Sequence, residues 1–249
     1  MAVADDVNGV AVVDVQQRYI PDVSIATTPT LQQRIDLGFA NTSGNTETLN
    51  FNGKYQLINH TQGYHKEMLH IGVEGGLLVT KDGDSTTNEE YTTTFKLEQE
   101  FANAWSLYFR LDWLRNRFKN FDHKIMIGKG VGKEIFSGSY GTLKLKLGGA
   151  YNIQHYHNTQ ASDYFGSFTQ YLSYQRGFQN QSNFYIKVGA SESFEELKDY
   201  EIIGVLGVTF QLGEGFHLVV EEEMDYDALP AVGFETHDSK TIVRLGYRF

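Results

Sequence analysis

The sequence predicts an all-β protein: an up-and-down antiparallel transmembrane β-barrel of about 12 strands with short turns and loops. Three observations predict it. The 249 residues include 15 Tyr, 17 Phe and 25 Gly but only 3 Pro, a balance that favours strands joined by tight turns. Segments of about ten to fifteen residues alternate in polarity between clusters of Gly, Asn, Asp and Ser. Aromatic residues gather near the ends of these segments, as they do at the two interfaces of a membrane barrel.

The composition excludes several other classes of protein. Hydrophobic residues make up 41% of the chain, which is too much apolar surface for a disordered protein. A mean hydropathy of -0.37, with charged residues spread over the whole length, argues against a helical membrane protein. The net charge of -10 argues against nucleic acid as a partner. The chain has no cysteine, so it has neither a disulfide framework nor a thiolate metal site.

The chain divides into an N-terminal extension, residues 1–30, whose order the sequence does not define, and a barrel, residues 31–249. The first residues lack the positive and apolar regions of a signal peptide, and we expect that a leader has been removed. Eleven turn clusters divide the barrel into strands: Ser43-Gly44-Asn45, His60 to His65, Lys81 to Thr87, Ala102-Asn103-Ala104, Asn116 to Phe121, Phe136 to Gly141, His157 to Asp163, Phe178 to Ser182, Phe194 to Asp199, Gly213-Glu214-Gly215 and Pro230 to Phe234.

The alternation is clearest in residues 143–154. Leu143, Leu145 and Leu147 share one face of the expected strand, while Lys144 and Lys146 share the other. A soluble barrel would turn the apolar face inward, and an outer-membrane barrel would turn it toward lipid. Roughly 18 residues are available for each strand and its connection, which suits membrane-crossing strands of about 9–11 residues better than soluble strands of about five or six. The membrane orientation is therefore favoured.

The C-terminal segment has the most specific local pattern. Val243, Leu245, Tyr247 and Phe249 alternate up to the last residue. This pattern resembles the C-terminal signature by which bacterial outer-membrane barrels are recognised for insertion. We therefore predict that these four residues form an assembly signal read by the outer-membrane assembly machinery.

Several segments are similar to the YdiY-like "salt-induced outer membrane protein" family. They are the hairpin Arg34 to Tyr55 with Ser43-Gly44-Asn45-Thr46 at its turn, Gly130-Val131-Gly132, the strand Leu143 to Tyr151, and the end Arg244 to Phe249. The resemblance covers residues 31–249 and implies a barrel in the outer membrane of a Gram-negative bacterium, with no assigned chemistry. Lys133 stands where an aromatic residue is expected, which leaves open whether Lys129 and Lys133 of the sixth strand face lipid.

An outward apolar face would place a set of charged residues in the lumen. These residues could line a narrow pore, or they could form ion pairs that close the lumen, and the sequence leaves both alternatives open. The set comprises Arg34, Asp36, Lys54, His70, Glu74, Lys96, Glu98, Glu100, Arg110, Asp112, Lys144, Lys146, Lys187, Glu201, His217, Glu221, Glu223, Asp225, Lys240, Arg244 and Arg248.

Four basic residues gather around one expected outer turn of this acidic chain. They are Arg115, Arg117, Lys119 and Lys124, and we predict that they contact lipopolysaccharide phosphates. A solvated basic turn is the alternative. The pair His155 and His157 has no visible third ligand, so neither a metal nor another cofactor is expected.

The predicted function is that of an outer-membrane β-barrel acting as a narrow pore or as a structural envelope protein, without catalysis. An outer-membrane lipid hydrolase or deacylase and a soluble β-barrel binding module are the alternatives. Ser106, His155 and Asn152 are the hydrolase candidates, but their spacing matches no catalytic motif. Outer-membrane lipid is the other expected partner, and a monomer is favoured.

Overall fold

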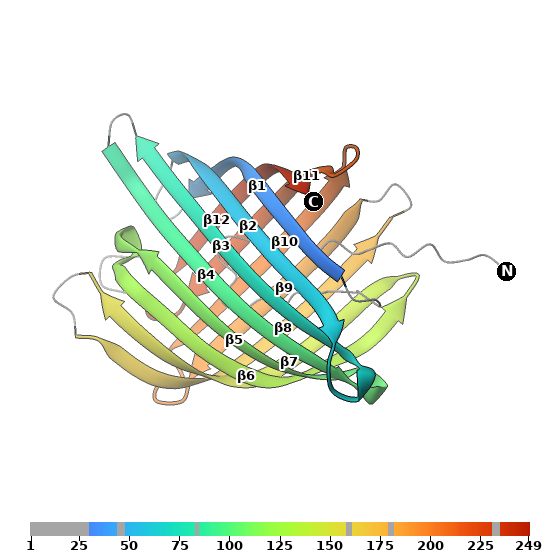
Figure 1. Ribbon diagram of the computed structural model, residues 1–249. Coiled ribbons are helices and arrows are strands. Elements are labelled where there is room, and N and C mark those ends of the chain that lie inside the picture. Colours follow the sequence, from blue (N-terminus) through green and yellow to red (C-terminus); the bar gives the residue numbers. More distant parts are fainter. Residues whose placement is uncertain (1–29, 44–47, 83–84, 158–160, 179–181, 231–234) are drawn as a thin grey trace.

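A computed structural model describes residues 30–43, 48–82, 85–157, 161–178, 182–230 and 235–249. Its strands form one closed antiparallel barrel in which each strand pairs with its neighbours in sequence and β1 pairs with β12 (Figure 1). The strands are β1 (Thr30–Ser43), β2 (Thr48–Gln62), β3 (Met68–Asp82), β4 (Ser85–Phe101), β5 (Trp105–Asn116), β6 (Phe121–Gly138), β7 (Gly141–Tyr156), β8 (Asp163–Gly177), β9 (Asn183–Ser193), β10 (Tyr200–Gln211), β11 (Phe216–Asp227) and β12 (His237–Arg248).

The predicted all-β barrel is confirmed. Most turns lie where the sequence predicts them, and two of these contain the short 3-10 turns η2 (Ala102–Ala104) and η3 (Arg117–Lys119). The turn predicted from His60 to His65 was placed too early, because His60 still pairs with His70 and β2 continues to Gln62 before η1 (Tyr64–Lys66). The turn predicted from Lys81 to Thr87 was too long, since β3 and β4 extend into it.

None of the helical segments in the described part of the chain is long and apolar enough to cross a membrane. The predicted N-terminal extension, residues 1–30, lies outside the described residues except for Thr30. The tips of the turns at residues 44–47 and 231–234 lie outside them as well.

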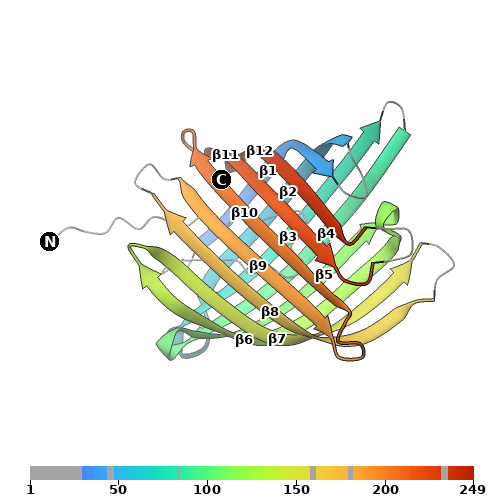
Figure 2. The same ribbon diagram turned by 180° about the vertical axis from the view of Figure 1, so that it is seen from behind.

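The two ends of the barrel are distinct. At one end, here called the terminal end, β1 begins and β12 ends, and the even-numbered strands up to β10 turn into the strands that follow them. At the other end, here called the loop end, lie η3 and the turn at residues 194–199. The strands run obliquely between the ends on both sides of the molecule, as Figure 2 shows from behind.

The outer face of the barrel is apolar and the inner face is polar. Leu147 is 38% exposed on the outside, whereas Lys144 and Lys146 are buried on the inside. The same division holds in β5, where Leu107 faces outward and Arg110 inward. Because large apolar side chains cover the outside, the surface suits lipid rather than water.

The register of β6 answers the question left open by Lys133. Lys129 pairs with Phe109, and Lys133 pairs with Trp105, both on the outward face of β5. Both lysines therefore face outward. The Lys133 ammonium lies 5.0 Å from the centre of the Trp105 ring, near the terminal end, where a lysine can reach the membrane interface.

The C-terminal strand closes the barrel. Phe249 and Gln33 exchange backbone hydrogen bonds of 3.0 and 3.1 Å. The Tyr247 ring stacks on Phe249 and contacts Phe216 from β11. The alternation predicted for Val243, Leu245, Tyr247 and Phe249 is thus an outward-facing row at the seam, and its role in assembly stays a prediction.

Candidate functional site in the barrel lumen

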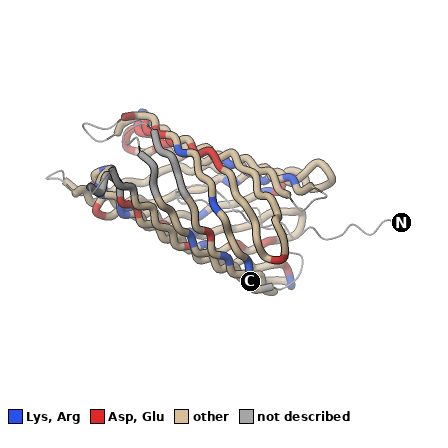
Figure 3. The backbone as a smooth tube through the Cα atoms, turned by 90° about the horizontal axis from the view of Figure 1, so that it is seen from above, with Lys and Arg blue, Asp and Glu red and all other residues tan. Residues whose placement is uncertain are grey.

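The lumen contains the charged residues that alternation placed there. Acidic and basic residues are interspersed along the strands (Figure 3). The structure places on the inner face, buried or largely so, the side chains of Arg34, Asp36, Lys54, Glu74, Lys96, Glu98, Arg110, Asp112, Lys144, Lys146, Lys187, Glu221, Glu223 and Arg244.

Ion pairs, both within strands and between strands, neutralise many of these charges. Asp36 accepts hydrogen bonds from Arg34 and lies 2.8 Å from His217. Lys96 contacts Glu74 at 2.6 Å, and Arg110 forms two hydrogen bonds with Asp112. Such pairing is expected because a charge held away from water must be compensated by an opposite charge or by hydrogen bonds.

Other contacts cross the lumen. Lys124 of β6 pairs with Glu201 of β10, although three strands separate them along the wall. Arg110 of β5 lies over the ring of Tyr171 of β8, 5.7 Å from its centre. Lys240 of β12 lies 3.8 Å from Glu90 of β4. These contacts constrict the space that a barrel of this strand number encloses.

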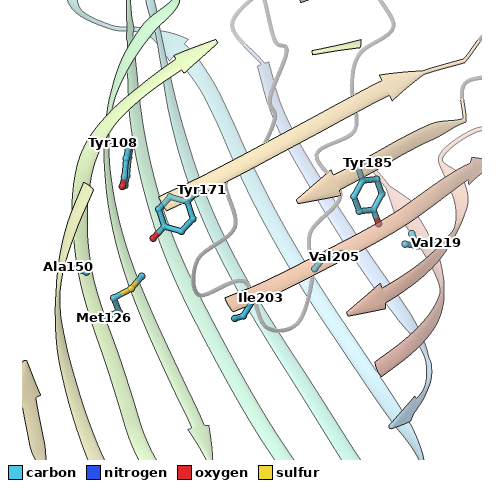
Figure 4. Close-up of a cluster of buried hydrophobic side chains, with 8 residues drawn as sticks. All are labelled: Tyr108, Met126, Ala150, Tyr171, Tyr185, Ile203, Val205 and Val219. Atoms are coloured by element: carbon cyan, nitrogen blue, oxygen red, sulfur yellow. The ribbon is translucent and has the colours of Figure 1, made fainter. Parts of the chain in front are cut away.

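A cluster of apolar side chains lies inside the barrel, and the sequence analysis missed it. Tyr108 and Tyr171 meet edge to face with their centres 6.0 Å apart. Tyr185 lies farther along the same inner surface, near Val219 (Figure 4). An indication existed in the run Ile202-Ile203-Gly204-Val205-Leu206 of β10, where both faces of the strand are apolar. The members are Tyr108, Met126, Ala150, Tyr171, Tyr185, Ile203, Val205 and Val219.

Cavities of different sizes lie along the lumen. A cavity of about 460 Å³ opens at the loop end and is lined partly by Gln154, Ser191 and Glu201. A cavity of about 50 Å³ beside Lys96 and Arg110 lies farther inside. A third, of about 110 Å³, lies at the terminal end beside Lys144. Of these three cavities, the one at the loop end is the largest and the one beside Lys96 and Arg110 is the smallest.

The loop-end cavity is acidic, and we call it the vestibule. Six carboxylates line it, from Asp163, Glu195, Glu196, Asp199, Glu201 and Asp227. Burial, together with the charge of Glu201, raises the pKa of Asp227 to about 6 and also raises the pKa of Asp199. Both groups lie at the rim, where the strands end. Because ionised carboxylates at this density give the vestibule a negative electrostatic potential, it favours cations over anions.

The structure does not bring the four predicted lipopolysaccharide-binding residues together. Lys124 was placed on the outer surface in error, since it lies in the lumen, 2% exposed, and pairs with Glu201. Lys119 is held at the mouth by Asp238 at 2.9 Å and by Asp225 at 3.4 Å. Arg117 is exposed and pairs with Asp122, and Arg115 lies on the outward face of β5. Of the four, only these two arginines lie outside the lumen, and contact with lipopolysaccharide stays a prediction.

The hydrolase candidates lie apart. Ser106 pairs with Gly132 near the terminal end and donates a hydrogen bond to Glu98. His155 lies near the loop end, 2.7 Å from Ser162, while Asn152 faces the lumen and bonds Ser167. Among the residues that the structure describes, no group of three or more His, Asp or Glu side chains is arranged to hold a metal ion.

A family described as "Protein of unknown function, DUF481" matches residues 35–249. Among solved structures, the chain is similar to the NanC porin, with a TM-score of 0.56, 7% identity, and coverage of 88% of this chain and 99% of that one. It is also similar to the translocator domain of the autotransporter NalP from Neisseria meningitidis, with a TM-score of 0.51, 10% identity and 90% coverage of both chains. No curated protein matches the chain. At these identities the similarity shows the outer-membrane type of barrel fold.

Proposed function

We propose that this chain, which belongs to the DUF481 family of proteins of unknown function, acts in the outer membrane of a Gram-negative bacterium as a narrow pore for small cationic solutes. In this proposal both ends of the barrel chain lie on the periplasmic side, so the loop end and its vestibule face outward. The finer kinship with the YdiY-like "salt-induced outer membrane protein" family belongs to the same proposal and rests on the shared segments of sequence.

The observation that carries the proposal is the step in free volume along the lumen. The vestibule has a volume of about 460 Å³, and a separate cavity farther inside, where Arg110 approaches Tyr171, has a volume of about 50 Å³. A path of this kind admits small solutes only, because larger ones would have to displace paired side chains. The carboxylates of the vestibule concentrate cations at its entrance.

Single-channel recording in a planar bilayer tests the proposal. The wild-type chain should give small, weakly cation-selective steps whose size scales with salt concentration. Lys124→Ala should enlarge the steps, because it removes the side chain that pairs with Glu201 across the lumen. Lys129→Ala is the matched control, since Lys129 faces outward from the same strand and should leave the steps unchanged.

A structural envelope protein with a closed lumen is the second candidate. The contacts that cross the lumen favour it, above all Lys124 with Glu201 and Lys240 with Glu90. In that case both the wild-type chain and Lys124→Ala would stay electrically silent while remaining folded. No catalysis is part of either proposal, and hydrolysis of lipid vesicles by the purified chain would contradict both.

A further inference from the structure

The outer surface of β1 to β5 carries a groove. It has a volume of about 660 Å³, within the range of small-molecule sites. Gly75 of β3 forms part of its floor, and a Cβ atom at that position would meet no other atom within 4 Å. Tyr55 lies beside Gly75 on β2, Thr93 lies beside it on β4, and Leu77 follows it along β3. The bare glycine thus leaves a gap in a surface otherwise covered by large side chains.

The register of the sheet shows how the groove runs. Leu37, Gly53, Leu77, Tyr91 and Arg115 form one row across the five strands. Leu37 and Leu77 lie against Gly53, within 3.3 and 3.6 Å of the position of a Cβ atom. Gly75 lies at the middle of β3, whereas Arg115 is one residue from the loop end of β5. The groove therefore leads from the middle of the barrel wall to its rim.

Arg115 gives the rim end of the groove a positive charge. It forms no ion pair with any residue that the structure describes, in contrast to Arg117, which contacts Asp122 at 3.1 Å. The nearby Glu89 accepts a hydrogen bond of 2.5 Å from the hydroxyl of Tyr91. A guanidinium at the rim, above an apolar groove, complements a phosphate joined to acyl chains.

We propose that this groove binds one molecule of lipid A, the phosphorylated lipid of lipopolysaccharide. An acyl chain lies over Gly75 between Tyr55 and Leu77, and a lipid A phosphate accepts hydrogen bonds from Arg115. The choice of lipid A rests on the orientation proposed above, in which the loop end faces outward and thus meets the leaflet that holds lipopolysaccharide. The lipid site lies on the outer face of the barrel wall, so it does not depend on which solute enters the lumen.

Native mass spectrometry of the full chain in detergent tests the site without a membrane and without conductance. Diphosphorylated, hexa-acylated lipid A should bind the wild-type chain one to one. Arg115→Gln should weaken binding about tenfold, and Arg115→Lys should restore part of it, because a lysine keeps the charge but loses the bidentate geometry. Arg117→Gln is the matched control and should change binding less than about twofold.

Filling the groove tests the acyl part of the site. Gly75→Leu should reduce binding of lipid A about tenfold, whereas Gly204→Leu should not. Gly204 is a fair control, since it lies on the outer face of β10 and a Cβ atom there also meets nothing within 4 Å. Heat-modifiable migration on gels shows that each variant is folded.

Several outcomes would overturn the proposal. They are equal binding by Arg115→Gln and wild type, equal losses in Gly75→Leu and Gly204→Leu, displacement of lipid A by phosphatidylcholine at equal concentration, and a lipid-free dimer that Gly75→Leu abolishes. Because Arg115→Gln leaves the glycine floor intact, the proposal stays testable even if Gly75→Leu does not fold. If the chain does not bind lipid A but conducts normally, only the lipid site is refuted. If it binds lipid A but gives no conductance in bilayers, only the pore is refuted.

Discussion

The two mouths of the lumen differ in charge and in space. At the loop end, six carboxylates surround a cavity of about 460 Å³, and the nearby Lys124 is already paired with Glu201. At the terminal end, Lys144 and Lys146 pair with Glu100 and Glu98 around a cavity of about 110 Å³. The loop end therefore has an excess of negative charge, whereas positive and negative charges nearly cancel at the terminal end. In the proposed pore, selectivity should therefore be decided at the loop end, while the ion pairs at the terminal end join β7 to β4.

The largest expected effect concerns the closure of the terminal end. Deleting Phe249 should lower the amount of protein in the outer membrane about tenfold or more, because the predicted assembly signal is lost. The purified chain should still fold in detergent, since one interfacial aromatic contributes only about 1.5–3 kcal/mol. Membrane fractionation and gel migration before and after boiling measure the two effects.

An aromatic residue at the opposite end provides the control for this deletion. Phe194 is 63% exposed in a loop-end turn. Phe194→Ser should leave the outer-membrane level unchanged. If both variants lower the outer-membrane level equally, the terminal Phe has no special role in assembly. The two ends would then differ in charge and not in their importance for assembly.

The second effect concerns the vestibule. Asp199→Asn combined with Asp227→Asn should reduce the preference for cations over anions about two- to fivefold, because two of the carboxylates at the mouth become neutral. Reversal potentials in a salt gradient measure it. Glu134→Gln at the terminal end is the control, and a change of the same size there would contradict the assignment of selectivity to the loop end.

The third effect is that the preference for cations over anions should depend on pH. Since burial and the charge of Glu201 raise the pKa of Asp227 to about 6, this carboxyl is neutral below that pH and negative above it. Cation preference should therefore rise as the pH increases from about 5 to about 7. The rise should be smaller in Asp227→Asn. A reversal potential that is flat over this range in the wild-type chain would show that the vestibule does not control selectivity.

The smallest effect is expected inside the lumen. Glu221 is fully buried on the inner face and accepts hydrogen bonds from Tyr185 and Arg244. Glu221→Gln should change the reversal potential by less than the vestibule variants do. It should also lower thermal stability, because Arg244 would lose its charged partner in the wall. A large change in selectivity at unchanged stability would move the selective region from the mouth to the middle of the barrel.

Much of the fold could be predicted from alternation and turn chemistry. Lys144 and Lys146 were placed correctly because a strand must send alternate side chains to opposite faces. Lys124 was misplaced because it was grouped with the basic residues of the neighbouring turn by closeness in sequence, without a face being assigned to it. Alternation with the outward-facing Ile127 puts Lys124 on the inner face, where the structure has it.

The apolar cluster in the lumen could not be predicted by the same rule. Assigning faces by charge assumes that apolar residues face lipid, but Tyr171 and Tyr185 face inward among polar neighbours of their own strands. The contacts between side chains across the lumen could not be predicted from the sequence either. Alternation gives the face of each residue, but contact between Arg110 and Tyr171 depends on how the sheet curves as it closes.

The contacts across the lumen also bear on how fast a solute could pass. Tyr108 and Arg110 of β5 reach Thr169 and Tyr171 of β8, so two distant parts of the wall are joined through their side chains. The closed hydrogen-bonded wall cannot widen without breaking its ladder, whereas a side chain can change rotamer within nanoseconds when its surroundings allow it. Passage would then be timed by the release and return of individual side chains, and conductance through this barrel should flicker rather than switch between long-lived states.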